Sequence, residues 1–69
     1  MVKVGGIYKH FKGGLYKVVC IAKHTETKED MVIYHDIRSP DVVWARPLSM
    51  WEEVVMHNGK LVPRFKFKH

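Results

Sequence analysis

A tryptophan and an arginine two positions apart are the residues best suited to hold a ligand. Trp44 and Arg46 would share one face of a β-strand, because side chains alternate along a strand. A planar guanidinium can bind an anion through two hydrogen bonds, and an aromatic ring beside it offers a surface for stacking. Together with His10, His24 and Tyr34, they form a candidate site for a nucleotide-like anionic ligand.

The same pair also has a structural interpretation. We expect Trp44 to fill the core, because so short a domain needs a large side chain at its centre. Arg46 could pair with Glu26 or Glu52 and brace the fold, or it could bind a ligand anion, because a buried arginine needs a partner. The sequence leaves open whether the two residues form a pocket or part of the core.

Basic residues alternate with aromatic residues from position 64 to position 68. In a strand these cations would lie on one face, ~6.6 Å apart, and such a row can follow a phosphate backbone. The alternative is the solvated face of an edge strand, where lysines discourage aggregation. Two further lysines join the row if the first and last strands lie side by side. The candidate nucleic-acid backbone residues are therefore Lys9, Lys12, Arg64, Lys66 and Lys68.

A third candidate surface is the short segment that contains Met50 and Trp51. These residues could contact a protein partner, because tryptophan is enriched at the dominant positions of interfaces. We favour a packing role, in which this turn covers one open end of the fold. A peptide-binding module remains the alternative function.

Catalytic and metal-binding patterns are missing from the sequence. Its five histidines and one cysteine show none of the close spacings of zinc sites. Cys20 and His24 would be ~13 Å apart on a strand, too far for one ion with bonds of ~2 Å. Glu52 and Glu53 are adjacent and would point in different directions from a helical turn. We expect no enzymatic activity, no metal and no cofactor.

The single cysteine lies in the longest apolar strand expected from the sequence. Burial in such a strand raises the pKa of a thiol and makes it unreactive. We therefore expect Cys20 to be buried and inert, packed with Val18, Val32 and Tyr34.

The chain of 69 residues has room for a single domain, residues 1–69, with one small core. Its net charge of +5 is unevenly distributed: residues 1–23 and 54–69 contain nine cations and no acid, and all seven acids lie in residues 24–53. Basic ends suit phosphate polymers or acidic partners. No segment has the ~18 apolar residues of a membrane span, and a lone cysteine suits a reducing compartment. We expect a cytoplasmic protein.

Short apolar runs separated by turn residues predict an all-β fold. Gly13-Gly14 and Asn58-Gly59 mark tight turns, and the second pair suits a type I′ hairpin. Ser49 could cap one helical turn over residues 49–53, with Glu52 completing the cap. The expected strands span residues 7–11, 15–24, 31–35, 42–46, 54–57 and 61–62, the last continuing after Pro63 as 64–68.

Five or six short antiparallel strands in so short a chain favour a small SH3-like barrel with the helical turn near residues 49–53. Closure of the barrel would also remove exposed strand edges. Alternation would turn Phe65 and Phe67 into the core and leave the neighbouring cations in solvent.

A family resemblance runs through residues 7–67 of the chain. The sequence resembles the small bacterial domain-of-unknown-function family numbered 1653, although it has Ile37-Arg38 where members usually have a Leu-Tyr pair. The resemblance implies a compact, β-rich bacterial domain and implies no activity. The segments that carry it are Tyr8–Gly13, Leu15–Val18, Ala22–Thr27, Val32–Tyr34, Trp44–Trp51, Gly59-Lys60 and Pro63–Phe65.

Two classes of function follow from these observations. The first is a non-enzymatic module, monomeric or weakly dimeric, that binds nucleic acid or a nucleotide-like anionic ligand. The second is a protein-protein interaction module that binds a peptide. Binding that depends steeply on salt would favour the first class, and a shallow dependence the second.

Overall fold

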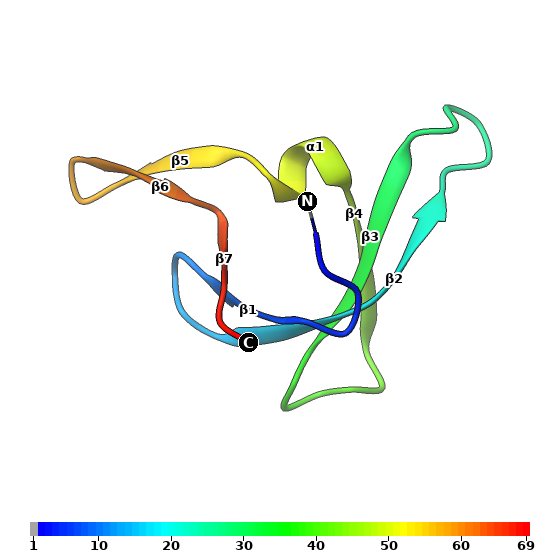
Figure 1. Ribbon diagram of the computed structural model, residues 1–69, viewed down its shortest axis with the longest axis horizontal. Coiled ribbons are helices and arrows are strands. Elements are labelled where there is room, and N and C mark those ends of the chain that lie inside the picture. The colour runs from blue at the N-terminus through cyan, green and yellow to red at the C-terminus, as the bar shows by residue number, and fades with distance from the viewer. Residues whose placement is uncertain (1) are drawn as a thin grey trace.

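The computed structural model describes residues 2–69 as a β-rich domain with one four-residue helix. The all-β class is confirmed, and no element boundary lies more than two residues from the predicted one. No helix in this part of the chain is long and apolar enough to span a membrane. The elements are β1 (Ile7–His10), β2 (Leu15–Lys23), β3 (Asp30–Asp36), β4 (Val43–Pro47), α1 (Leu48–Trp51), β5 (Val54–His57), β6 (Lys60–Pro63) and β7 (Phe65–Phe67) (Figure 1).

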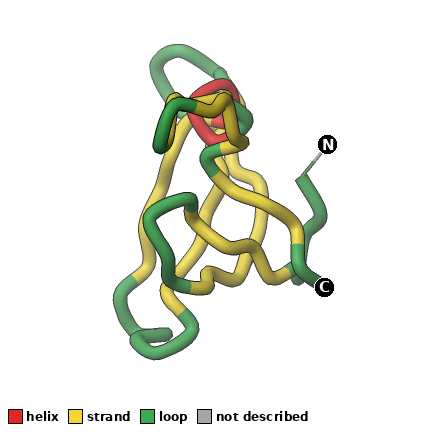
Figure 2. Tube along the Cα trace, turned by 90° about the vertical axis from the view of Figure 1, so that its left-hand side faces the viewer, coloured by secondary structure: helices red, strands yellow, loops and turns green. Residues whose placement is uncertain are grey.

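Five strands form one antiparallel sheet in the order β4-β3-β2-β1-β7, and β5 pairs with β6 in a separate hairpin. The first and last strands are neighbours, as expected, and Lys9 lies opposite Lys66. The predicted closed barrel is wrong, because among residues 2–69 no strand pairs with the free edge of β4. The chain enters α1 directly after Pro47, so β5 starts away from that edge. Figure 1 shows the hairpin reaching away from β3 and β4, and Figure 2 shows α1 at one end of the sheet.

A bulge in β2 changes which of its side chains face the core. Val18 lies opposite Tyr34, but the register then shifts, and Cys20 lies opposite Ile33. One extra residue in a strand reverses the alternation beyond it. Val18 is therefore fully buried, whereas Cys20 is exposed. The expectation that Cys20 is buried, against Val18 and Val32, is wrong.

The core is a cluster of aromatic rings closed by two valines. Trp51 of α1 stacks on Phe65 of β7, with ring centroids 3.7 Å apart and planes 5° apart. The rings of Tyr8 and Tyr34 contact Trp51 edge-on at 5.4 and 4.9 Å. Each aromatic pair adds ~0.5–1.5 kcal/mol beyond the burial of apolar area. The buried hydrophobic residues are Tyr8, Val18, Val32, Tyr34, Trp51 and Phe65.

The alternation expected in the last strand holds for one of its two phenylalanines. Phe65 is 7% exposed, but Phe67 is 46% exposed. β7 is an edge strand of the sheet, and the covering ring of Trp51 lies on Phe65. Phe67 instead contacts Tyr8 edge-on and lies below the ammonium of Lys3. The predicted burial of Phe67 is therefore wrong.

The predicted turn of the β5–β6 hairpin is present in the structure, but the predicted cap of the helix is not. Asn58 and Gly59 have φ values of 51° and 76°, the positive values that a type I′ turn requires. This confirms the predicted turn between β5 and β6. Ser49 does not cap the helix, because α1 begins at Leu48 directly after Pro47 and has no side-chain cap.

Candidate functional site

A hollow of about 290 Å³ lies on the core face of the sheet, beside the buried aromatic rings. Four of the five residues predicted to hold a ligand line this hollow, and His24 does not. Every strand of the five-stranded sheet contributes a side chain to it. We call it the Trp44 hollow, and its lining residues are His10, Tyr16, Tyr34, Trp44, Arg46 and Phe65.

Strand register explains why residues far apart in the sequence meet in the Trp44 hollow. Trp44 lies opposite Tyr34 in the β3–β4 pair, and His10 lies opposite Phe65 in the β1–β7 pair. Directly opposed residues of antiparallel strands project from the same face of the sheet. The aromatic rings and the cation therefore converge on one face.

Trp44 belongs to this site and not to the core. It is 54% exposed, whereas Tyr34 opposite it is 6% exposed. β4 is an edge strand, and the stacked rings of Trp51 and Phe65 already fill the centre of the core. The expectation that Trp44 fills the core is therefore wrong, and about half of its surface is open to a ligand.

Arg46 is held by aromatic groups. Its Nε donates a hydrogen bond to the Tyr34 hydroxyl at 3.3 Å, and its guanidinium carbon lies 5.6 Å from the centre of the Phe65 ring. Within residues 2–69 no carboxylate is in ion-pair contact with Arg46, so the expected brace to Glu26 or Glu52 does not form. Among residues 2–69, the terminal nitrogens of the guanidinium donate no hydrogen bond, so their N–H groups face the hollow without an acceptor from this part of the chain.

His10 is a neutral group in an electropositive environment. Its ring contacts Phe65 at 5.0 Å, and its Nδ1 accepts the backbone N–H of Lys12 at 3.1 Å, which leaves the ring proton on Nε2. Burial lowers the pKa of His10 below the usual 6.5, and the charges of Arg46, Arg64 and Lys12 lower it further. Cations from three separate segments therefore surround this imidazole.

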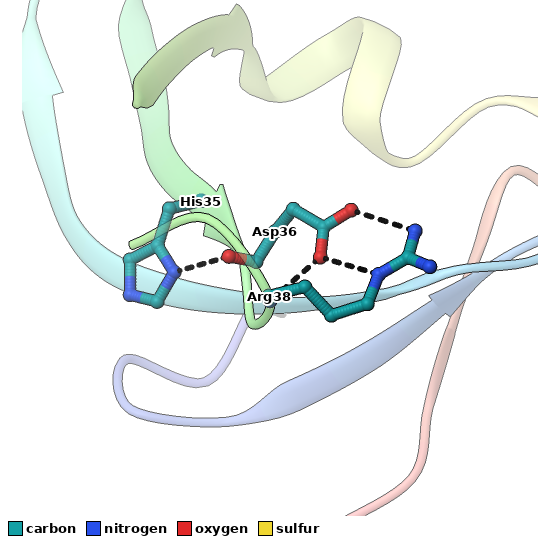
Figure 3. A network of polar contacts seen from close by, with 3 residues as sticks. All are labelled: His35, Asp36 and Arg38. Carbon is teal, nitrogen blue, oxygen red and sulfur yellow. Dashed lines mark hydrogen bonds and ion pairs between the residues drawn. The ribbon is translucent and has the colours of Figure 1, made fainter. Parts of the chain in front are cut away.

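β3 ends at an acid, Asp36, close to the Trp44 hollow. Asp36 lines a neighbouring hollow together with Tyr16 and Trp44. Figure 3 shows Arg38 turned back onto Asp36: its backbone N–H donates to Oδ1 at 2.8 Å, and its guanidinium donates to both carboxylate oxygens at 3.4 Å. These bonds, the backbone one first, lower the pKa of Asp36. Asp36 stays ionised, but Arg38 offsets its charge, so it repels a nearby anion less.

Three residues predicted to contact a ligand or a partner lie outside the Trp44 hollow. His24 shapes the turn between β2 and β3, where its Nδ1 accepts the backbone N–H groups of Glu26 and Thr27 at 3.1 and 3.3 Å. Trp51 is 2% exposed, so a partner cannot reach it without opening the core. Met50 is 43% exposed. The burial of Trp51 agrees with the packing role preferred from the sequence.

The predicted row of basic residues is interrupted. Lys9 and Lys66 lie opposite each other in the β1–β7 pair, and Lys68 follows β7 as an exposed residue. Arg64 lies between β6 and β7, and its Nη2 donates to Glu53 Oε1 at 3.0 Å. Its side chain is 22% exposed, so Arg64 braces the hairpin and does not extend the row.

Tyr16 and Phe65 also line the Trp44 hollow, although neither is among the ligand-binding residues predicted from the sequence. Tyr16 lies two positions before the buried Val18, so alternation could have placed it on the core face. Its proximity to His10, with ring centroids 6.3 Å apart, depends on strand pairing that the sequence does not specify.

The Trp44 hollow presents groups that can stack on a planar ring and donate hydrogen bonds. The hollow offers aromatic faces, an arginine and a neutral imidazole, and its lining includes no serine, threonine, cysteine or carboxylate. Across residues 2–69, no three histidine, cysteine or acidic side chains are placed to hold a metal ion.

The fold and the site together define a small β-rich domain, in which an open antiparallel sheet carries a candidate ligand pocket lined by aromatic rings and Arg46. A family model described as a protein of unknown function, DUF1653, matches residues 6–67, and the chain belongs to this family. This confirms the resemblance seen in its sequence.

A solved structure is similar to almost the whole domain. The crystal structure of a DUF1653 protein from Bordetella bronchiseptica matches with a TM-score of 0.82 and 31% sequence identity. The match covers 93% of this chain and 85% of that chain. No curated protein matches the chain.

Proposed function

We propose that this protein is a non-enzymatic binding domain of the bacterial cytoplasm that takes a nucleotide-like ligand in the Trp44 hollow. Such a ligand combines a planar ring with a negatively charged group. The observation that carries the proposal is a half-exposed indole beside Arg46, an arginine for which no acid among the described residues provides a partner.

The lining of the Trp44 hollow suits both parts of a nucleotide. Trp44 offers an aromatic face, and stacking of a base on an aromatic side chain contributes ~1–3 kcal/mol. Tyr34 and Phe65 form a buried floor, which fixes the surroundings of the bound ring. The free N–H donors of Arg46 suit a phosphate, because guanidinium-phosphate hydrogen bonds are charge-assisted.

The charges around the hollow also favour an anion. Arg46, Arg64 and Lys12 all act on His10, and a bound anion would relieve their mutual repulsion. The Nε2–H of His10 can serve as a further donor, because its Nδ1 is occupied by the backbone of Lys12. The net charge of +5 would speed the encounter with an anionic ligand.

A titration of tryptophan fluorescence with mononucleotides tests this function. Trp44 is the exposed tryptophan among the described residues, so a stacked base should quench the emission. Arg46→Gln should weaken binding about ten- to hundredfold, the usual cost of losing a hydrogen bond to a charged group. Lys23→Gln is the matched control, because it removes the same charge at the β2–β3 turn, away from the hollow.

If both variants lose the same affinity for the mononucleotide, only the overall charge matters, and the Trp44 hollow is not the binding site. Failure of every mononucleotide to bind at ~50 mM salt, where electrostatic binding is strong, would reject the nucleotide ligand. Peptide binding through a surface that includes Met50 would then become the better hypothesis.

A further inference from the structure

Two further hollows share lining residues with the Trp44 hollow. Trp44 and Tyr16 also line a hollow beside the loop after β3, which Ser39 borders. On its other side, His10 also lines a hollow of about 270 Å³, where β1 and β7 meet the β5–β6 hairpin. The three hollows are therefore adjacent, from the β3–β4 loop to His57 of the hairpin, and we call this series of hollows the track.

The hollow at the hairpin, which we call the lysine hollow, combines apolar side chains with two lysines and two histidines. Lys9 and Lys66 both line it and lie directly opposite each other in the β1–β7 pair. Like charges directly opposite each other destabilise a sheet. Within residues 2–69 no acid is in ion-pair contact with either lysine. Phe11 and His57 form one wall of the hollow, with ring centroids 5.4 Å apart.

We propose that the ligand is a single-stranded nucleic acid, with one unpaired base stacked on Trp44 and a phosphate further along the strand bound between Lys9 and Lys66. The inference rests on the proposed function and adds a second subsite to it. A phosphate between the two ammonium groups replaces their repulsion with attraction and releases counterions, the main source of backbone affinity.

The shape of the track selects a single strand over other nucleic acids. A base reaches an indole in a hollow only when its face is free, and the base faces of a duplex are covered by stacking. A mononucleotide occupies one hollow and leaves the two lysines without an anion. Strand alternation places Lys9 and Lys66 on the sheet face opposite His10, so the bound strand passes around the sheet margin where β1 turns at Phe11.

Fluorescence anisotropy with a labelled oligo-dT of about eight nucleotides, close to the site size of a small single-strand-binding fold, tests the inference. A GC-rich hairpin duplex, which stays paired under the assay conditions, and free thymidine monophosphate are the comparison ligands. The test variant is Lys9→Gln with Lys66→Gln. The control is Lys17→Gln with Lys23→Gln, which removes the same charge from exposed lysines outside the track.

The single strand should bind more tightly than both comparison ligands. The test variant should weaken it and flatten the slope of log affinity against log salt by up to ~0.7 for each lost phosphate contact. Its affinity for thymidine monophosphate, measured by tryptophan fluorescence, should stay unchanged. The control should bind the single strand more tightly than the test variant does.

Three results would overturn the inference. They are a duplex that binds as tightly as the single strand, a control that loses as much affinity as the test variant, and an oligonucleotide that binds no better than thymidine monophosphate. In each case the proposed function would still hold if thymidine monophosphate binds and Arg46→Gln weakens this binding. If the monophosphate also fails to bind, the proposed function fails with the inference.

Discussion

Trp51 and Phe65 stack face to face, with ring centroids 3.7 Å apart and planes 5° apart. This contact joins α1 to β7 and so connects the middle of the chain to its last strand. Phe65 also forms part of the floor of the Trp44 hollow and lies below the guanidinium of Arg46. The position of the candidate site therefore depends on the packing of the core.

The first prediction concerns the two phenylalanines of β7. Phe65→Ala should cost ~3–5 kcal/mol, because it removes a buried ring. That is about the whole stability that the core of so small a domain supplies, ~3–5 kcal/mol, so the variant should be largely unfolded at 25 °C. Phe67→Ala, the same change at a half-exposed ring, should remain folded. Urea unfolding followed by circular dichroism checks this, and equal midpoints for both variants would contradict the described core.

The second prediction separates the candidate site from the core through the two tryptophans. Trp44→Ala should lower the free energy of unfolding by ~1 kcal/mol or less, because Trp44 is half exposed on an edge strand. Trp51→Ala should lower it by ~3–5 kcal/mol. Urea midpoints give the stabilities, and Trp44→Ala should lose affinity for a fluorescently labelled mononucleotide, measured by anisotropy. If Trp44→Ala is unfolded, Trp44 is part of the core and the description of it as a half-exposed site residue is wrong.

Most of the local structure could be predicted from the sequence, because each strand carries its own signal. Apolar runs such as Val18–Ile21 are bounded by glycine, proline and polar turns, and these limits depend on neighbouring residues alone. Asn58-Gly59 specified its turn type for the same reason, since few residue pairs accept two positive φ values. The side of the sheet that a residue faces was harder to predict.

Three errors have non-local causes. Cys20 was assigned to the core by strict alternation, and the bulge beside it, set by pairing with β3, turned it outward. Trp44 was assigned to the core by its size, but its strand lies at a sheet edge. Barrel closure was inferred from the number of short strands, whereas it depends on where the chain leaves β4 after Pro47.

In the candidate site, too, the residues placed by local spacing could be predicted, whereas those placed by sheet order could not. Trp44 and Arg46 share a face because they are two residues apart, and Tyr34 joins them through the adjacent strand pair β3–β4. His10 reaches them through a sheet order in which β1 separates β2 from β7, and this order is not written in any local pattern. His24 had a suitable side chain, but its turn lies away from the hollow.

The third prediction follows from the outward position of Cys20. A thiol reagent should label native Cys20 at a rate close to that of the protein unfolded in urea, because an exposed thiol needs no opening of the core. Cys20→Ser should change the free energy of unfolding by less than ~0.5 kcal/mol, as surface substitutions usually do. Labelling that occurs only through rare unfolding would place the thiol inside the core and contradict the β2 bulge.

The last prediction is a pH dependence that arises from His10. The folded protein lowers the pKa of His10, through burial first and then through Arg46, Arg64 and Lys12, whereas the unfolded chain has the usual value of 6.5. The unfolded state therefore binds more protons between those two pKa values, and stability must fall as the pH drops from 6.5 toward the folded pKa. Above that window His10 is neutral in both states and contributes no pH dependence.

Urea midpoints of the wild type and of His10→Gln, measured from neutral to mildly acidic pH, give the contribution of His10. The variant lacks the titrating ring, so its midpoint should fall less steeply below the usual histidine pKa of ~6.5. Parallel curves for wild type and His10→Gln would show that folding does not alter the protonation of His10, and the electropositive environment assigned to the Trp44 hollow would then be wrong.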